Sequence, residues 1–218
     1  MAKKSKKEKK NSERSELKIL LSDELMGSKC SDKYIKYISA SEMNLKEARH
    51  LLKKELKANV DKKVSVLMSV GSYHATAKFN EWRESSVQGN ERRLFGDALS
   101  GFKRELVMLE RLGEKYECKI VMASLIPLPD HQDMKSDKEA VTHMASKLFV
   151  AANEEINCYS RKIGIDALVL KKFCDCGNKN KYITGQRKIN LKKYKDGKPN
   201  KDLKRKLMSQ AVNRLRAM

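Results

Sequence analysis

Short apolar runs alternate with longer amphipathic stretches along most of the chain. A run of about four to eight apolar residues bounded by polar ones is typical of a buried strand. Residues 63–71, KVSVLMSVG, form the clearest run, and its unbroken, β-branched character favours a central parallel strand covered on both faces. The same pattern predicts further strands at residues 16–21, 33–39, 118–129 and 165–170.

Between these runs, apolar residues recur at every third or fourth position, which is the spacing of one face of a helix. This spacing predicts helices over residues 41–57, 92–116 and 137–162. Ser41 or Asn44 can cap the first of them, because both side chains accept hydrogen bonds from amides of a first helical turn. Strands and helices therefore alternate, which predicts an α/β protein with an open parallel sheet.

The end of the chain, residues 200–218, predicts one more amphipathic helix. Asn200 is its expected N-cap, and Asp202 lies in its first turn, where negative charge is favourable. The apolar stripe expected to dock on the domain consists of Leu203, Leu207, Ala211 and Leu215. The basic residues expected to face outward are Lys204, Arg205, Arg214 and Arg216.

Basic residues outnumber acidic ones, with 48 Lys and Arg against 28 Asp and Glu, so the formal net charge is +20. The excess gathers at the ends, because residues 1–18 carry a net +5 and residues 171–218 a net +13. Self-repulsion of this size is more tolerable when a polyanion neutralises it, and nucleic acid is the commonest such partner. A lysine-rich face that only keeps the protein in solution is the simpler alternative.

The lysine-rich head, residues 1–15, has the composition of a disordered tail, and residues 16–218 are expected to form one domain. The head lacks the apolar segment of a secretory leader, and no run reaches the roughly 18 apolar residues of a membrane span. The five cysteines are an odd number, which argues against a disulfide framework. We therefore expect an intracellular protein, cytoplasmic or nuclear, without a membrane partner. Cys174 and Cys176 have no second pair nearby, so neither a metal nor another cofactor is expected.

Three motifs follow predicted strands or precede the last helix: Gly71 after the third strand, IPLPD at residues 126–130, and KDGKPN at residues 195–200. In their order and spacing the chain resembles the SGNH (GDSL-type) hydrolase family over residues 16–218. It looks most similar to the SGNH domains of some non-LTR retrotransposon proteins. The resemblance implies a three-layer α/β/α, flavodoxin-like fold with a parallel five-stranded sheet.

The same resemblance allows the catalytic positions of the family to be compared with this chain. The family uses a serine nucleophile, glycine and asparagine oxyanion donors, and a histidine base from an Asp-x-x-His motif. Here Glu24, within SDEL, stands at the serine position, and Tyr73 stands at the asparagine position. Asp196 is kept, but Pro199 replaces the histidine. The resemblance thus implies degenerate catalytic positions, no catalytic residue, and a protein that is not an enzyme.

Binding of nucleic acid, with RNA favoured, is the function that the charge pattern then predicts. A similar loss of catalytic residues accompanies RNA binding in the SGNH-like domain of Oskar, which this chain resembles in architecture. The expected phosphate-binding residues are Lys179, Lys181, Arg187, Lys188, Lys192, Lys193, Lys195, Lys198, Lys204, Arg205, Arg214 and Arg216, with Lys3, Lys4, Lys6, Lys7, Lys9 and Lys10 of the head. Tyr182 and Tyr194 can stack on unpaired bases or pack against the domain. The protein could also form a homo-oligomer.

An enzyme with a rebuilt site is the alternative. Asp23, Glu24, His74 and His131 fall at the carboxyl ends of predicted strands, where functional sites of open parallel sheets lie. Two carboxylates and two histidines can bind a metal or exchange protons with a substrate, as an esterase-like or metal-assisted hydrolase requires. Polar residues gather at this edge in any such sheet, so the cluster by itself does not establish an enzyme.

Overall fold

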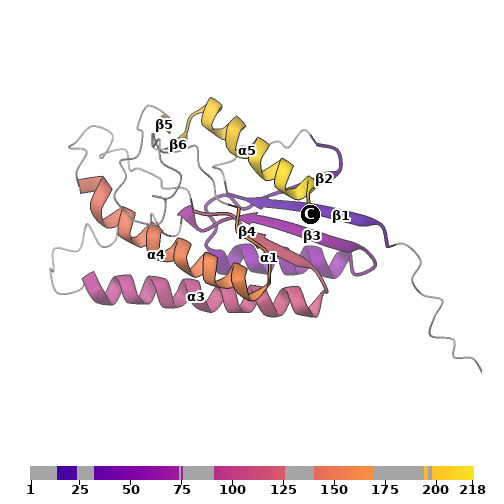
Figure 1. Cartoon of the computed structure of the whole chain (residues 1–218), viewed down its shortest axis with the longest axis horizontal. Helices are drawn as coiled ribbons and strands as arrows, with labels where there is room; N and C mark the ends of the chain where they lie inside the picture. The colour runs from indigo at the N-terminus through magenta and orange to yellow at the C-terminus, as the bar shows by residue number, and fades with distance from the viewer. Residues whose placement is uncertain are drawn as a thin grey trace, which may run out of the picture.

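A computed structural model of the chain describes residues 14–23, 32–73, 75, 91–125, 140–168, 194–195 and 198–218. Figure 1 shows a central sheet with helices on both faces. Within the described residues the strands of this sheet are β1 (Glu16–Ser22), β2 (Ile35–Ser39), β3 (Lys63–Ser69) and β4 (Lys119–Met122). All are parallel, in the order β2-β1-β3-β4. The predicted α/β class, parallel sheet and three layers are confirmed.

The edge beside β4 differs from the prediction. The sequence predicts a fifth strand at residues 165–170, but in the described part of the chain only Leu168 pairs there, in a parallel bridge to Ala123. The Leu168 amide donates to the Met122 carbonyl at 2.9 Å, and the Ser124 amide donates to the Leu168 carbonyl at 2.8 Å. The described sheet therefore has four strands, with one bridge at the position where a fifth would complete a flavodoxin-like order.

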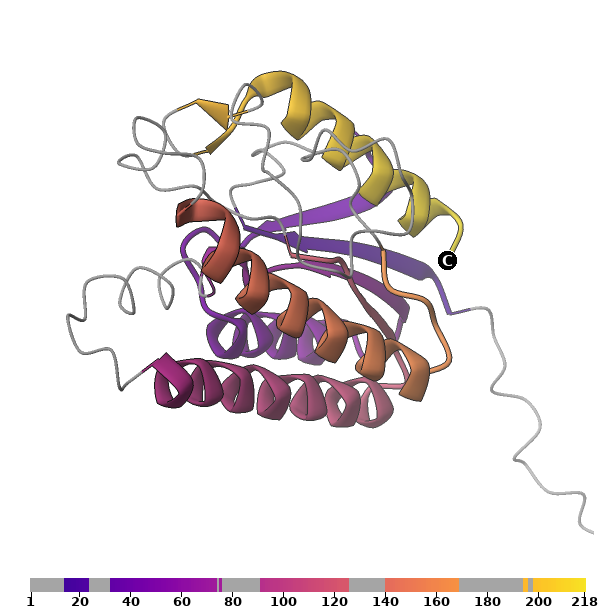
Figure 2. The same cartoon turned by 60° about the vertical axis from the view of Figure 1, so that its left-hand side comes forward.

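One face of the sheet is covered by α1 (Leu45–Ala58), α3 (Glu91–Lys115) and α4 (Ala140–Lys162), which lie below the strands in Figure 2. Alternate strand residues, such as Leu21 and Met68, are fully buried against the apolar stripes of these helices. The three predicted helices are confirmed, with ends shifted by a few residues, as is usual at helix termini.

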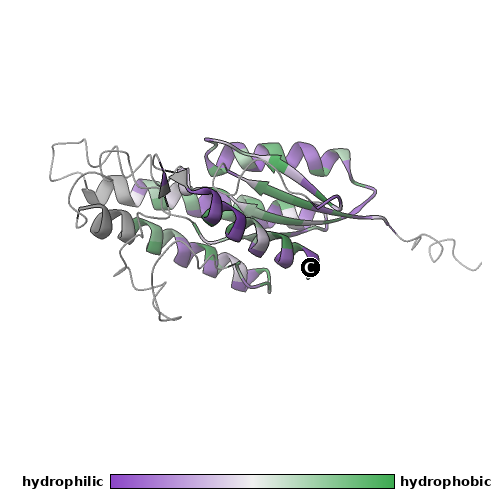
Figure 3. Ribbon diagram, turned by 90° about the horizontal axis from the view of Figure 1, so that it is seen from above, coloured by the Kyte–Doolittle hydropathy of each residue, from purple (hydrophilic) through white to green (hydrophobic). Residues whose placement is uncertain are grey.

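The other face is covered by α5 (Lys201–Arg216), which lies above the strands in Figures 1 and 2. Strand residues of the opposite parity, such as Leu20 and Val121, pack with it. The predicted stripe is confirmed, because its buried members are Leu203, Leu207, Ala211 and Leu215. Hydrophilic and hydrophobic colours alternate along α5 in Figure 3.

Just before α5, β5 (Tyr194–Lys195) and β6 (Lys198–Pro199) form a short antiparallel pair that the sequence pattern does not predict.

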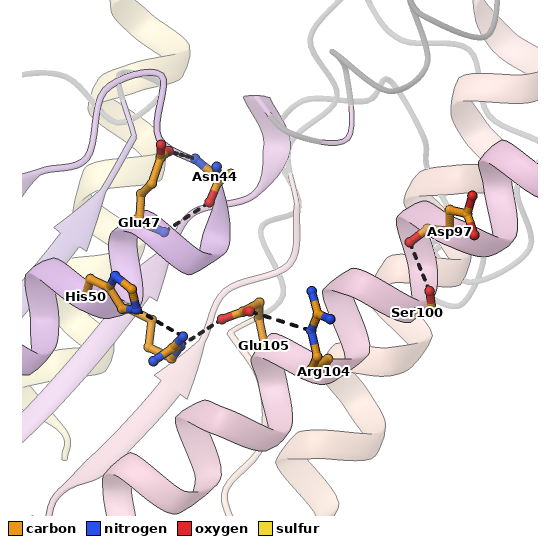
Figure 4. Close-up of polar contacts among 8 residues, drawn as sticks. Asn44, Glu47, His50, Asp97, Ser100, Arg104 and Glu105 are labelled. Carbon is orange, nitrogen blue, oxygen red and sulfur yellow. Dashed lines mark hydrogen bonds and ion pairs between the residues drawn. The ribbon is translucent and has the colours of Figure 1, made fainter.

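Asparagine caps begin both α1 and α5. The Asn44 side chain accepts a hydrogen bond from the Glu47 amide at 3.0 Å, and the Glu47 carboxylate accepts one from the Asn44 amide at 2.9 Å (Figure 4). This capping box satisfies two backbone amides at the helix start. The Asn200 side chain accepts a hydrogen bond from the Leu203 amide at 2.9 Å. Asn44 is therefore the cap that the first helix uses, and the Asn200 prediction is confirmed.

A buried ion pair joins α1 to α3. Arg49 Nε donates to Glu105 Oε2 at 2.7 Å, and each side chain is only 10% exposed (Figure 4). Two more ion pairs join α3 to α4, Lys103–Glu155 at 3.4 Å and Lys162–Glu110 at 3.7 Å. Charges on this face of the sheet therefore pair between helices.

The chain already contacts the sheet at its first described residues. The Ser15 carbonyl accepts a hydrogen bond from the Lys63 amide at 3.1 Å, and Arg14 lies 3.6 Å from the Glu117 carboxylate. The predicted tail otherwise lies outside the described residues. Among the helices that are described, none has the length and apolar character needed to cross a membrane.

Candidate functional site

The carboxyl ends of β2, β1 and β3 meet at one edge of the sheet. The Ser22 hydroxyl, at the end of β1, donates to the Asp23 carbonyl at 2.9 Å. The Ser22 carbonyl accepts a hydrogen bond from the Ala40 amide at 2.7 Å, and the Asp23 amide donates to the Ser69 carbonyl at 3.1 Å. Ser22, Asp23 and Ser69 are all buried. Asp23 of the SDEL segment is therefore held at the middle of this edge by the neighbouring strand.

A sharp turn follows β3 at the same edge. Gly71 has a φ of +116°, a backbone conformation that residues with a side chain rarely adopt. A Cβ on this glycine would lie 3.1 Å from Phe102 and 3.2 Å from Leu125, so the turn packs directly against the core. The Ala75 amide donates to the Gly71 carbonyl at 2.9 Å and closes one helical turn. A glycine is therefore favoured at position 71 for two reasons: the backbone has a positive φ, and a Cβ would crowd Phe102 and Leu125.

Side chains around this turn differ in their access to solvent. Ser72 is buried, whereas Tyr73, which the resemblance predicts at the family's asparagine position, is 41% exposed. Beyond β4, the Asn153 side chain of α4 accepts a hydrogen bond from the Leu125 amide at 2.8 Å. Sequence reasoning missed Asn153, because an asparagine within an amphipathic helix gives no signal of a distant backbone partner.

Several predicted site residues lie outside the described part of the chain. They are Glu24, His74, His131 and Asp196. Cys174 and Cys176, where no metal is expected, also lie outside it. The structure therefore brings Asp23 next to the end of β3 but does not describe the rebuilt site as a whole. Pro199, which the resemblance predicts at the family's histidine position, lies in β6 and pairs with Tyr194 of β5. Within the described residues, no group of three or more His, Cys, Asp or Glu side chains is placed to hold a metal ion.

α5 carries six basic residues and one acidic residue. Lys201, Arg205 and Lys206 are exposed, and Lys204 is half-buried. Lys201 and Lys204 lie in the first turn, where the helix dipole disfavours positive charge, and Arg205 and Lys206 follow in the second turn. Arg205 lies 3.7 Å from Asp202, but an exposed pair of this kind contributes little stability. The positive charge of these turns therefore does little for the helix and is accessible to an external anion.

The other two arginines of α5 contact the protein itself. Arg216 Nε donates to the Asp32 carboxylate at 2.8 Å, and Arg214 donates to the Asp166 carbonyl at 2.7 Å. Hydrogen bonds from the Tyr34 amide and from Arg216 lower the pKa of Asp32 below its usual value. Both arginines lie in the last turn, where positive charge is favourable. That they also bind phosphates stays a prediction.

Tyr34 is an exposed aromatic residue that the sequence pattern did not single out. Its side chain is 73% exposed, and Lys33 Nζ lies 5.0 Å from the centroid of its ring. The strand predicted at residues 33–39 includes both residues, but β2 begins only at Ile35. The two side chains therefore precede the strand and lie on the surface.

Of the other predicted nucleic-acid-binding residues, Lys195 is exposed in β5 and Lys198 lies in β6. The rest lie outside the described part of the chain, namely Lys3, Lys4, Lys6, Lys7, Lys9, Lys10, Lys179, Lys181, Arg187, Lys188, Lys192 and Lys193, together with Tyr182. The structure leaves these as predictions.

No family model matches the chain, and no curated protein matches it in sequence. Solved structures do match its fold. A candidate acylhydrolase from Bacteroides fragilis has a TM-score of 0.58 at 11% identity, and the match covers 95% of this chain and 88% of that one. A GDSL-like lipase from Bacteroides thetaiotaomicron has a TM-score of 0.56 at 12% identity, over 92% of this chain and 87% of that one. The acetyl xylan esterase AlAXEase has a TM-score of 0.57 at 8% identity, and the match covers 91% of this chain and 99% of that one.

These neighbours correct one prediction. Replacement of the family's catalytic positions predicts a protein that is not an enzyme, and neighbours that carry the names of hydrolases contradict this. The prediction was wrong because it judged activity from a few aligned positions, whereas at least 91% of the chain superposes on these proteins. At such low identity the likeness concerns the fold and carries no substrate with it. The chain therefore has the SGNH (GDSL-type) hydrolase fold.

Proposed function

We propose that this SGNH-fold protein binds nucleic acid, RNA in preference to DNA, through the basic outer side of α5. The observation that carries the proposal is the placement of Lys201, Arg205 and Lys206, which we call the α5 basic patch. All three are exposed at the end of the helix where positive charge does not stabilise it. A polyanionic partner would neutralise them, and the net charge of +20 supports a partner of this kind.

Phosphate groups are the ligands that suit this patch. Arg205 can donate two parallel hydrogen bonds to one phosphate, and the two lysines act as point charges. Lys195, exposed in β5 shortly before α5, adds further positive charge close to the patch in sequence. Contacts of this kind recognise the nucleic-acid backbone rather than its sequence, and their strength falls steeply with salt.

Fluorescence anisotropy with labelled single-stranded RNA, single-stranded DNA and duplex DNA tests this proposal. The wild-type chain is compared with the patch variant Lys201→Gln, Arg205→Gln, Lys206→Gln. The matched control is Lys53→Gln, Lys54→Gln, Lys57→Gln, which removes the same charge from exposed positions of α1 on the opposite face. Any effect of net charge alone is then the same in both variants.

The patch variant should bind RNA about tenfold or more weakly than wild type, since three charged contacts are lost. The α1 control should lose much less affinity. Equal weakening in both variants would mean that total charge alone attracts the nucleic acid, and the α5 patch would then be refuted. Failure of the wild-type chain to bind any of the three nucleic acids would refute the function itself.

Hydrolysis of an ester at the carboxyl edge of the sheet is a second candidate. It is favoured by the fold, which the chain shares with proteins named as a lipase and an acetyl xylan esterase, and by the burial of Asp23 at the end of β1. A buried carboxylate at this edge stands where sheets of this type place their chemistry. Ser72, buried in the turn after β3, supplies a hydroxyl at the same edge.

Turnover of p-nitrophenyl acetate, with and without divalent metal ions, tests this second candidate. Asp23→Asn and Ser72→Ala should each abolish turnover if the carboxyl edge is the site. The patch variant of α5 serves as the control and should retain full activity. Turnover that neither edge variant reduces would place the reaction elsewhere in the protein.

A further inference from the structure

We infer that Tyr34 and Lys33 form a stacking site for an unpaired base beside the end of α5, so that the nucleic acid bound on this face is single-stranded. The inference rests on the proposed function, because it adds a base-binding group to the phosphate-binding α5 basic patch. The occupant is a nucleotide strand whose phosphates follow α5 while one of its bases lies on the ring of Tyr34.

The exposure of Tyr34 is the first observation behind this inference. At 73% it is the most exposed large hydrophobic side chain in the described part of the chain. Tyr116 provides the contrast, because it too has a neighbouring lysine, with Lys115 Nζ 5.9 Å from its ring centroid. Tyr116, however, packs against the core, and its ring contributes to stability there. The ring of Tyr34 has no comparable packing role and remains accessible to a ligand.

A single carboxylate ties Tyr34 to α5. One oxygen of Asp32 accepts a hydrogen bond from the Tyr34 amide at 2.9 Å, and the other accepts one from Arg216 Nε at 2.8 Å. Arg216 is the last residue of α5, and its carbonyl accepts a hydrogen bond from Lys18 Nζ at 3.2 Å. Figure 1 shows the start of β2 beside the C-terminal end of α5. The backbone that carries the ring is therefore held next to α5 before any ligand binds.

One strand can reach from the basic patch to this ring. α5 has 16 residues and so spans roughly 24 Å at 1.5 Å per residue, a length that several nucleotides can follow. Between the patch and the C-terminal end, Ser209 and Asn213 are exposed, and both side chains can donate hydrogen bonds to phosphate oxygens. The outward side of α5 thus offers cations first, then neutral donors, and an aromatic ring near its end.

Stacking on Tyr34 selects for single strands. The bases of a duplex are stacked on one another, whereas the flat face of an unpaired base can lie on a tyrosine ring. Lys33 holds its ammonium over one face of this ring, 5.0 Å from the centroid, so the base would stack on the other face and the strand's phosphates would have a positive charge nearby. Every base has such a face, so this surface should tolerate many sequences and bind single strands more tightly than duplexes of the same length.

The test uses two single-stranded oligonucleotides of equal length and charge, one with bases and one built from abasic sites. Fluorescence anisotropy with the full chain compares wild type, Tyr34→Ala, and Tyr34→Phe, which keeps the ring. Val60→Ala is the matched control, because Val60 is another exposed apolar side chain, at 62%. Thermal unfolding of each variant establishes that it is folded.

Tyr34→Ala should weaken binding of the base-bearing strand by about fivefold or more, the low end of the effect of losing one stacked base. It should leave binding of the abasic strand unchanged, and Tyr34→Phe and Val60→Ala should bind both strands like wild type. A loss that is equal for both strands, or no loss for either, overturns the stacking site and leaves the α5 basic patch standing. If the wild-type chain binds neither strand, the proposed function fails and this inference fails with it.

Discussion

The two faces of the sheet carry their charge in different ways. On the face covered by α1, α3 and α4, ion pairs such as Arg49–Glu105 and Lys103–Glu155 join one helix to the next. α3 has six basic and five acidic residues, and α1 has five and two. On the opposite face, α5 has six basic residues and one acidic residue. Charge is therefore most nearly balanced where helices pack on one another, and least balanced on the helix that lies alone among those described.

The paired charges between helices therefore contribute to stability, whereas the exposed charges of the α5 basic patch are available to bind a ligand. A pair such as Arg49–Glu105 is tied to the fold, because neither charge can be buried without the other. The same division holds within α5, where Arg214 and Arg216 contact Asp166 and Asp32 at the favourable end of the helix. The α5 basic patch lies at the unfavourable end. Changes on the first face should therefore affect unfolding, and changes in the patch should affect binding.

The largest expected effect comes from breaking the pair between α1 and α3. Arg49→Met leaves the Glu105 carboxylate buried with only the exposed Arg104 nearby, at 4.0 Å, so the free energy of unfolding in urea should fall by up to about 3–5 kcal/mol. The double variant Arg49→Met, Glu105→Met should recover most of that loss, because no charge is left buried. A double variant as unstable as the single one would show that the pair acts through packing rather than charge.

The next effect concerns the attachment of α5. Leu207 is fully buried in the apolar stripe that docks α5 on the sheet, so Leu207→Ala should lower the free energy of unfolding by about 3 kcal/mol. Leu109→Ala, at a fully buried position of α3, is the matched change on the other face. Hydrogen exchange should show α5 amides losing protection more in the first variant than in the second. A loss below about 1 kcal/mol for Leu207→Ala would mean that the apolar stripe does not hold α5 in place.

A smaller effect should follow the titration of Asp32. Its pKa is lowered by the Tyr34 amide and by Arg216, so its stabilising effect is present above the ordinary pKa of 3.8 and is lost as the pH falls through the lowered value. Wild type should therefore unfold at a higher temperature than Asp32→Asn at neutral pH, and the two should converge in acid. A difference in Tm that stays constant down to low pH would contradict an electrostatic role for this carboxylate.

The smallest expected effect on stability comes from Lys201→Glu, which should stabilise the fold while weakening the binding of RNA. Lys201→Glu places a negative charge in the first turn of α5, which should raise the free energy of unfolding by about 0.3–1 kcal/mol. The same change should weaken binding of RNA, because it reverses one charge of the basic patch. Tighter binding, or lower stability, would show that Lys201 belongs to the structure and not to the nucleic-acid surface.

The sequence predicts the elements of this fold well, because burial sets the apolar period within each of them. The predicted strand ends are wrong where an apolar run continues beyond the residues that form the hydrogen bonds of the strand. The run at residues 118–129 predicts one strand, but β4 ends at Met122, and the next residue, Ala123, forms only a bridge with Leu168. Long-range contacts leave no local period either: Arg216 and Asp32 are 184 residues apart, and the Leu125–Asn153 bond spans 28.

The candidate site is harder to predict for the same reason. The ends of the predicted strands identified Asp23 and the Gly71 turn at the carboxyl edge, and the structure describes both there. Tyr34 was missed, because a lysine and a tyrosine before an apolar run look like the start of a strand. The prediction of a protein that is not an enzyme was wrong, because it rested on a few motif positions, whereas the solved structures that share this fold carry the names of hydrolases.

The salt dependence of RNA binding tests most directly whether the α5 basic patch, rather than the net charge of +20, holds the nucleic acid. Plotted against the logarithm of salt concentration, the logarithm of the binding constant falls by about 0.7 per phosphate contact on a single strand. The variant Lys201→Gln, Arg205→Gln, Lys206→Gln should therefore have a slope about 2 units shallower than wild type, and the α1 control should keep the wild-type slope. Equal slopes in all three proteins, or the same reduction in both variants, would contradict this account.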